Sequence, residues 1–365
     1  MLKLSQITDV IEKFAPLPLQ ESYDNAGLII GNKNMDINAA LICLDSTEEV
    51  LDEAIANGSN LIIAHHPIIF TGIKKLNGKN YVERVIIKAI KNDIAIYAAH
   101  TNLDNVQQGV NAKICEKLGL IETKILSPIK NNLKKLVTYS PTKDAENIRQ
   151  ALFTAGAGVI GNYGECSFNS PGFGTFKAGD STNPHVGKIG EQHTEEEVRI
   201  ETIFPAHLLS NIIKSLTEAH PYEEVAFDIF PIENINPTIG SGMIGKLKTP
   251  TNEMTFLNSL KSIMNTKAIR HTKPLDKKIE TIAVCGGAGS FLLKEAINQN
   301  ADIFITGDFK YHEFFDAEDK IVIADIGHYE SEQFTKEIFY DLLMTNFPNF
   351  AARISNVITN PINYI

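Results

Sequence analysis

The sequence contains no tryptophan, and its 4 cysteines are scattered over 365 residues without a C-x-x-C pair. We therefore expect reduced thiols, and burial explains most of them better than catalysis does. No apolar run is long enough to span a bilayer, and the N-terminus lacks the charged-then-apolar pattern of a secretory signal. These absences predict a cytoplasmic protein with no membrane partner.

Positive charge is also scarce. The chain carries 34 Lys and Arg against 44 Asp and Glu, a formal net charge of -10. This balance argues against nonspecific binding of nucleic acid. With 43% apolar residues the chain can bury a sizeable core, and its length predicts two or three domains.

Two stretches of the chain alternate buried strands with helices. The predicted strands are 39–44, 61–64 and 94–99 in the first stretch, and 281–284, 303–306 and 321–324 in the second. Ser46 and Glu49 predict a capping box for the first of these helices. Strands separated by helix-length segments are typical of a largely parallel sheet. We expect an α/β fold with two similar lobes.

The segment between these stretches has a different pattern. Its strands and helices follow the order β-α-β-β-α-β, which predicts an inserted ferredoxin-like α+β domain. The expected domains are therefore 1–128 and 247–365 as two halves of one α/β domain, with 129–246 inserted between them.

A pair of histidines gives the first indication of chemistry. His65 and His66 follow an apolar run, and Pro67 then ends the strand. Neutral imidazole is the commonest metal ligand in proteins. Taken alone, a His-His-Pro sequence is more often incidental than metal-binding.

A second cluster lies near the other terminus. His328 and Glu332 are four residues apart after another predicted strand, so a helix would place them on one face. Asp104 follows a third strand end. In isolation, His328 and Glu332 can be an exposed helix pair, and Asp104 can be an N-cap or turn former. Because open α/β sheets bind ligands at the carboxyl ends of their strands, we interpret the two clusters as halves of one metal centre.

Other polar groups at strand ends allow more than one interpretation. Asp308 and His312 can be acid/base groups, substrate contacts or helix caps, and His100 can be a spare ligand, a partner of a ligand or a structural residue. The glycine-rich loop 285–290 can cradle a phosphate, but a tight turn explains it equally well. The segment 220–224 of the insert is by default a solvated turn.

Five motifs together resemble the NIF3-like family, whose bacterial members are often labelled GTP cyclohydrolase 1 type 2 homologs. The motifs are Tyr23-Asp-Asn-Ala-Gly-Leu28, Ala64-His-His-Pro67, His100-Thr-Asn-Leu-Asp104, Thr306-Gly-Asp308 and Gly327-His-Tyr-Glu-Ser-Glu332. The longer members carry a middle domain similar to CutA and PII proteins. One departure is visible, since Tyr23 stands where the family usually has tryptophan.

The resemblance implies a site for two divalent metal ions, such as zinc, iron or manganese. Its ligands would be His65, His66, Asp104, His328 and Glu332. It also implies a homohexamer whose metal sites face an inner cavity.

The first functional hypothesis is a metal-dependent hydrolase that acts on a nucleotide, by the cyclohydrolase route. Candidates for its acid or base are Asp308, His312, His100 and Glu330. The alternatives are a metallophosphoesterase acting on nucleotides and a non-catalytic metal-binding regulator or scaffold.

Overall fold

The computed structural model describes residues 1–365, which form two compact units. Unit 1 comprises Met1–Pro128 and Pro237–Ile365, and unit 2 comprises Ile129–Asn236. The expected boundary at residue 246 falls inside strand β12 (Gly240–Asn252). Because β12 pairs with strands of unit 1 on both of its sides, the insert ends before this strand rather than at residue 246.

The first sheet of unit 1 has five strands in the order β17-β4-β5-β6-β2. Their bounds are β2 (Gly27–Ile30), β4 (Ala39–Cys43), β5 (Leu61–Ala64), β6 (Ala95–Ala98) and β17 (Ala351–Ile354). The strands β4, β5 and β6 run parallel, as the sequence predicts, and every residue in them is buried. They are apolar along their whole length because both faces of the sheet are covered.

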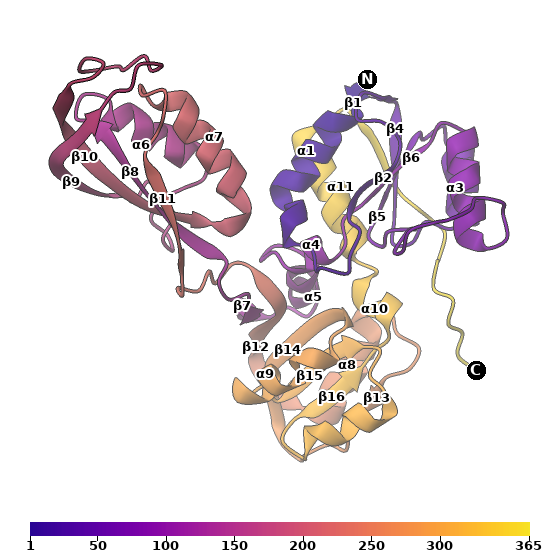
Figure 1. Cartoon of the computed structure of the whole chain (residues 1–365). Helices are drawn as coiled ribbons and strands as arrows, with labels where there is room; N and C mark the ends of the chain where they lie inside the picture. Colours follow the sequence, from indigo (N-terminus) through magenta and orange to yellow (C-terminus); the bar gives the residue numbers. More distant parts are fainter. The chain divides into compact units, whose positions relative to one another are not determined.

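The C-terminal segment returns to this first sheet. Helix α11 (Thr335–Asn346) packs against α1 (Leu4–Phe14), and β17 then pairs in parallel with β4 (Figure 1). The free edge of β4 thus receives a strand from the far end of the chain. The expected halves 1–128 and 247–365 therefore do not coincide with the two sheets.

The second sheet of unit 1 has six strands in the order β13-β16-β15-β14-β12-β7. The bounds not yet given are β7 (Ile121–Pro128), β13 (Arg270–His271), β14 (Lys278–Ala288), β15 (Ile303–Gly307) and β16 (Val322–Asp325). Three neighbouring strands, β14, β15 and β16, run parallel, and the other three pair antiparallel. The first sheet therefore contains four adjacent parallel strands, β17, β4, β5 and β6, and the second contains three.

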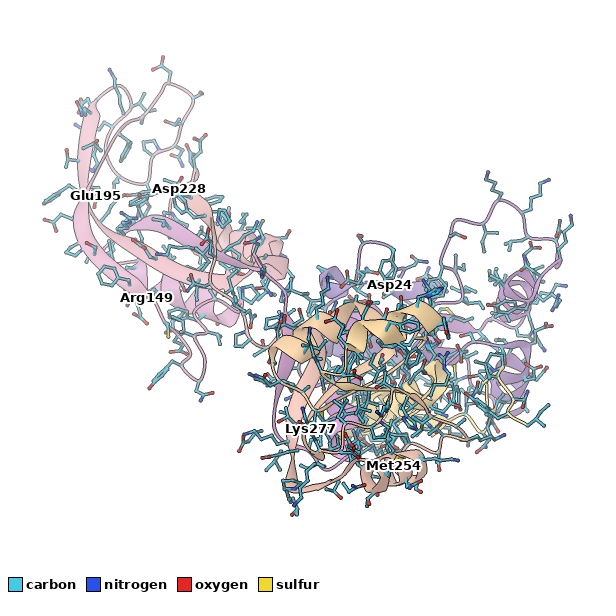
Figure 2. The ribbon with its side chains drawn as sticks, turned by 90° about the horizontal axis from the view of Figure 1, so that it is seen from below. Asp24, Arg149, Glu195, Asp228, Met254 and Lys277 are labelled. Carbon is cyan, nitrogen blue, oxygen red and sulfur yellow. The ribbon has the colours of Figure 1, made fainter.

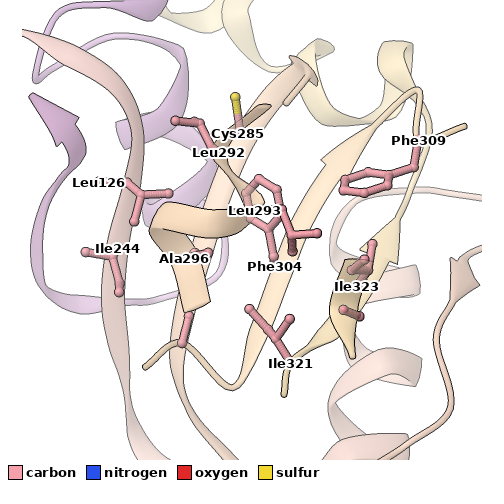
Figure 3. Close-up of a cluster of buried hydrophobic side chains, with 13 residues drawn as sticks. Leu126, Ile244, Cys285, Leu292, Leu293, Ala296, Phe304, Phe309, Ile321 and Ile323 are labelled. Carbon is pink, nitrogen blue, oxygen red and sulfur yellow. The ribbon is translucent and has the colours of Figure 1, made fainter. Parts of the chain in front are cut away.

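A cluster of buried apolar side chains covers one face of the second sheet (Figure 3). Phe304 of β15 lies at its centre and is fully buried, next to Phe309 and to Leu293 of helix α9 (Leu293–Asn298). The phenyl rings of Phe304 and Phe309 meet edge-on, with centroids 6.2 Å apart. This packing fixes the loops at the carboxyl ends of β14, β15 and β16.

Helices cover the sheets of unit 1. Those flanking the strands are α2 (Glu48–Ala56), α3 (Tyr81–Lys91), α5 (Val110–Lys117) and α8 (Glu253–Ile263). The expected capping box of Ser46 and Glu49 does not form, because Thr47 is the N-cap and its hydroxyl accepts the N–H of Val50. No helix is both long and apolar enough to cross a membrane.

Unit 2 has the element order β-α-β-β-α-β that its sequence predicts. The elements are β8 (Leu133–Pro141), α6 (Ala145–Thr154), β9 (Phe168–Lys177), β10 (Gln192–Pro205), α7 (Leu209–Ala219) and β11 (Phe227–Ile232). Its antiparallel sheet has the order β11-β8-β10-β9. Apolar residues of both helices and of the sheet form its core, while side chains such as Asp228 are exposed (Figure 2).

The buried position of Phe304 leads to a stability prediction. Phe304→Ala should lower the free energy of unfolding of unit 1 by about 3–5 kcal/mol, because it leaves a cavity in the core. Urea denaturation measures this loss. The control is Met254→Ala on the outer face of α8, where the side chain is 46% exposed and the change should stay within about 0.5 kcal/mol (Figure 2). Equal effects of the two substitutions would contradict the packing described here.

Candidate metal centre

The first sheet brings His65 and His66 to one edge of a cavity. Both follow β5 directly, and their backbone N–H groups donate to the carbonyl of Leu44 at 3.1 and 3.0 Å. These hydrogen bonds hold the pair beyond the strand end. Asp104 comes from the same edge, as the last residue of the short helix α4 (Thr101–Asp104). It is therefore not an N-cap.

The second sheet supplies the other side of the cavity through the short helix α10 (His328–Glu332), which follows β16. One helical turn places His328 and Glu332 on one face, with Nε2 of the imidazole 3.1 Å from Oε2 of the carboxylate. Glu332 is 2% exposed. A solvated helix pair therefore does not describe these two residues.

The side chains from the two sheets meet at Glu332. Its Oε2 lies 3.0 Å from Nε2 of His66, and its Oε1 lies 3.7 Å from Nε2 of His65. The Nε2 atoms of His66 and His328 are 3.3 Å apart, and Asp104 lies 3.7 Å from Nε2 of His65. All five residues expected to act together therefore converge on one point of unit 1.

Each histidine is oriented through its other ring nitrogen. The Nδ1–H of His65 donates to the carbonyl of Ala99 at 2.9 Å, and that of His66 donates to Asp45 at 2.7 Å. His328 donates in the same way to Asp308 at 2.8 Å. Because a carbonyl and an ionised carboxylate only accept hydrogen bonds, these partners place a proton on Nδ1. Nε2 of each ring, the atom that metal coordination would use, then faces the cavity.

Two buried polar atoms at this point, Nε2 of His65 and Oδ1 of Asp104, have no hydrogen-bond partner. An unsatisfied buried polar atom costs free energy, and two on one site are exceptional in a folded protein. Nitrogen and oxygen donors with free lone pairs are the set that a divalent transition metal ion coordinates. The residues present therefore fit such an ion.

The electrostatics of the cluster agree with this interpretation. Burial alone would lower the pKa of His66 and of His328, but Glu332 and the carboxylates on Nδ1 raise them to about 10 and about 11. Burial would raise the pKa of Glu332, whereas the neighbouring imidazoles hold it well below its usual range. Burial and the charge of Glu332 raise the pKa of Asp104 to about 8. The cluster thus attracts positive charge.

The cluster lies in a cavity of about 800 Å³. His100 also reaches into it, and its ring centroid is 5.3 Å from those of His65 and His66. Its Nδ1–H donates to Asp24 at 2.8 Å, which leaves Nε2 without a role in that contact. His100 therefore lies beside His65 and His66, with which it forms a further group of possible metal ligands.

The other candidate residues have different positions. Asp308 lines the cavity, but it accepts the Nδ1–H of His328 and so orients a possible ligand.

Glu330 and His312 do not line the cavity. Glu330 is 5% exposed and accepts a hydrogen bond from Asn360. His312 lies outside the cavity lining, where its ring packs against Tyr311 and Phe315. The structure therefore gives no support for His312 or Glu330 as an acid or base at this cavity, because neither residue lines it.

The glycine-rich loop after β14 does not offer a phosphate cradle. The N–H groups of Gly286, Gly287 and Gly289 donate to the side chains of Asn111, Ser331 and Thr306. A Cβ at Gly287, where φ is 63°, would lie 2.5 Å from Oε1 of Glu332. The loop is therefore a tight turn that lets Glu332 approach.

Sequence reasoning missed two residues that orient the site. Asp45 follows β4 and binds both His66 and the hydroxyl of Thr359 from the C-terminal segment. Asp24 lies in a loop and binds His100 and Thr101. Asp45 does share the strand-end position of the other site residues. That position is the one signal in the sequence that could have revealed it.

The fold and site define an α/β protein with an inserted domain and with clustered His, Asp and Glu groups that can bind metal ions. The model of the family Duf34/NIF3 (NGG1p interacting factor 3) matches residues 2–361. The chain belongs to this family, which confirms the resemblance seen in its motifs.

Relatives extend over the whole chain. A protein of Bacillus subtilis (strain 168) called GTP cyclohydrolase 1 type 2 homolog is 39% identical and covers 99% of this chain and 98% of its own length. The crystal structure of a Bacillus cereus protein related to NIF3 superposes with a TM-score of 0.86 at 39% identity, covering 100% of this chain and 99% of its own. The crystal structure of Staphylococcus aureus protein SA1388 superposes with a TM-score of 0.79 at 29% identity. The match covers 100% of this chain and 99% of that protein.

The contacts of Asp24, labelled in Figure 2, predict a pH-dependent effect on stability. Burial would raise its pKa, but hydrogen bonds from His100 and Thr101 hold it well below the usual range. Asp24→Asn should therefore lower the free energy of unfolding at pH 7 by about 1–3 kcal/mol.

The way in which this loss of unfolding free energy changes with pH follows from the lowered pKa of Asp24. A carboxyl with a lowered pKa stabilises the fold fully above its unfolded value of about 4, and this contribution is lost as the pH falls further. Thermal unfolding of the unsubstituted protein and of Asp24→Asn between pH 3 and pH 8 measures this effect. A stability difference between the two that stays constant across the range would refute the prediction.

Proposed function

We propose that the protein is a metal-dependent hydrolase whose ions are held by His65, His66, Asp104, His328 and Glu332. The observation that carries this proposal is the pair of unpartnered buried atoms on His65 and Asp104, next to the buried carboxylate of Glu332. No hydrogen-bond network within the chain satisfies these atoms. A purely structural role does not account for them.

The grouping of the donors favours two ions. Nε2 of His65 lies near Asp104 and Oε1 of Glu332, while His66 and His328 lie near Oε2 of Glu332. Glu332 belongs to both groups. Mixed nitrogen and oxygen ligands suit zinc, iron or manganese without choosing among them.

A pair of divalent ions held there would lower the pKa of a water molecule and stabilise negative charge on the substrate. The residues of the chain have separate tasks. Asp45 and Asp308 orient His66 and His328 through Nδ1. Asp24 holds Nδ1 of His100, whose ring lines the cavity beside His65, and this position makes His100 the candidate group to transfer a proton.

Relatives called GTP cyclohydrolase 1 type 2 homolog motivate the choice of reaction. In a cyclohydrolase reaction, one water molecule adds to C8 of the purine and opens the imidazole ring, and a second water molecule releases formate. His100 would transfer the proton to the departing ring nitrogen. Hydrolysis of a phosphoester at the same site is the competing reaction, since paired metals also serve that chemistry.

Metal content tests the ligand set directly. The protein should bind two divalent ions per chain, and His66→Ala or Glu332→Gln should reduce this number, because each substitution removes a donor from the cluster. Elemental analysis after gel filtration measures the stoichiometry. His312→Ala is the matched control and should retain full metal content, since its ring lies outside the cavity. Unchanged metal binding in both ligand variants would disprove the assignment.

Product analysis separates the reactions. With a purine substrate, the metal-loaded protein should release formate, and His100→Ala should slow this release about 100-fold or more while metal content persists. Release of phosphate without formate would favour the phosphoesterase. A formate rate unaffected by His100→Ala would remove His100 from the mechanism.

A second candidate function is a regulator or scaffold, favoured by a separate cavity of about 640 Å³ in unit 2. Aromatic rings of Phe176 and Tyr222 line it, and the Tyr222 hydroxyl donates to Glu197. The segment 220–224 thus helps to form a cavity instead of a simple solvated turn. In this case the protein, expected to be a homohexamer, would bind a small molecule at this cavity and show no turnover when loaded with metal.

A further inference from the structure

The cavity around the metal cluster is acidic. Carboxylates line it at five positions, and no lysine or arginine lines it. The five are Glu21, Asp45, Asp104, Asp308 and Glu332. Guanidinium and ammonium groups are the side chains with which proteins bind phosphate esters. Within unit 1, a polyphosphate would therefore meet no cationic side chain at this cavity.

Bound metal ions do not reverse this balance. Two divalent ions would bring four positive charges, against the five negative charges of the lining carboxylates. The histidines would be neutral when they act as ligands. Like charges at close range in a partly buried cavity repel each other strongly, so each phosphate added to a ligand would oppose its binding.

Backbone groups offer no alternative anion site. The N–H groups of Gly286, Gly287 and Gly289 are already used by side chains. Helix α2 begins at the cavity, after Ser46 and Thr47, but its first turn carries two acidic residues, Glu48 and Glu49. These charges oppose an anion at a helix N-terminus, where phosphates otherwise bind.

The lining also contains aromatic side chains. Four of these rings remain between 51% and 69% exposed. They are Tyr23, Phe70, Tyr81 and Phe291. Exposed rings around a cavity provide faces on which a flat ring can stack.

We infer that this cavity accepts a flat, uncharged heterocyclic substrate, at the level of a nucleobase or nucleoside, and discriminates against its phosphate esters. The inference rests on the proposed function, because it names the substrate of the same site. It departs from a nucleotide substrate such as GTP. The ring stacks among the exposed aromatic residues, and its reacting carbon faces the cluster of His65, His66 and Glu332.

Equilibrium binding to the zinc-loaded full-length protein tests the inference. Guanosine, GMP and GTP are titrated by calorimetry, with adenosine and its phosphates in parallel. The nucleosides should bind, and affinity should fall about tenfold or more from nucleoside to triphosphate. The remaining triphosphate affinity should rise with salt, as repulsion is screened. Triphosphates that bind tighter than nucleosides, or nucleosides that do not bind, would overturn the inference.

Two variants sharpen the test. Phe291→Ala should weaken nucleoside binding about tenfold while the metal content stays unchanged. Ile362→Lys places a positive charge in the cavity lining and should raise GTP affinity relative to the matched variant Ile362→Gln. Equal GTP affinity of the Lys and Gln variants would contradict the electrostatic argument.

Failure of this inference can be told apart from failure of the proposed function. If the ligand variants lose metal and formate is released, but GTP is preferred over guanosine, the hydrolase stands and the substrate class is wrong. If metal content is insensitive to His66 and Glu332, the proposed function itself fails.

Discussion

The approach of Glu332 to His66, 3.0 Å apart, joins the two sheets of unit 1 at the carboxyl ends of their parallel strands. A buried carboxylate surrounded by imidazoles is unfavourable in an apolar core unless opposite charge or a metal ion satisfies it. Unpartnered atoms on His65 and Asp104 add to this cost. The contacts that make the cluster unfavourable without a bound ion also make it suitable for divalent cations.

A second layer of contacts gives the cluster its orientation. Asp45, Asp24 and Asp308 each accept the Nδ1–H of one histidine, and they come from three separate loops. The C-terminal segment contributes as well, since Thr359 donates to Asp45 after β17 has joined the first sheet. Residues near both ends of the chain, Asp24 and Thr359, thus contribute to the orientation of the site. Catalysis with a water molecule requires such fixed ligand orientation, because small displacements of the reacting groups slow a reaction strongly.

The sequence predicted the parallel strands well, because strands buried on both faces, such as those before His65 and Asp308, are continuous apolar runs. It also predicted which side chains meet, because all of them follow the carboxyl ends of strands, although these strands belong to two sheets. The Nδ1 partners Asp24 and Asp45 were missed because ring orientation depends on contacts between distant loops. The end of the insert was placed wrongly because β12 pairs with the distant strand β7. In their first residue pair, Gly240 lies 112 positions after Pro128. Such long-range pairing leaves no local pattern.

Anomalous X-ray diffraction from crystals of the full-length protein, grown with zinc, tests the central claim most directly. The account predicts two anomalous peaks per chain within coordination distance of the five side chains, with Glu332 contacting both ions and His100 adjacent to them. A single ion elsewhere, or peaks that leave His65 and Glu332 uncoordinated, would contradict the account.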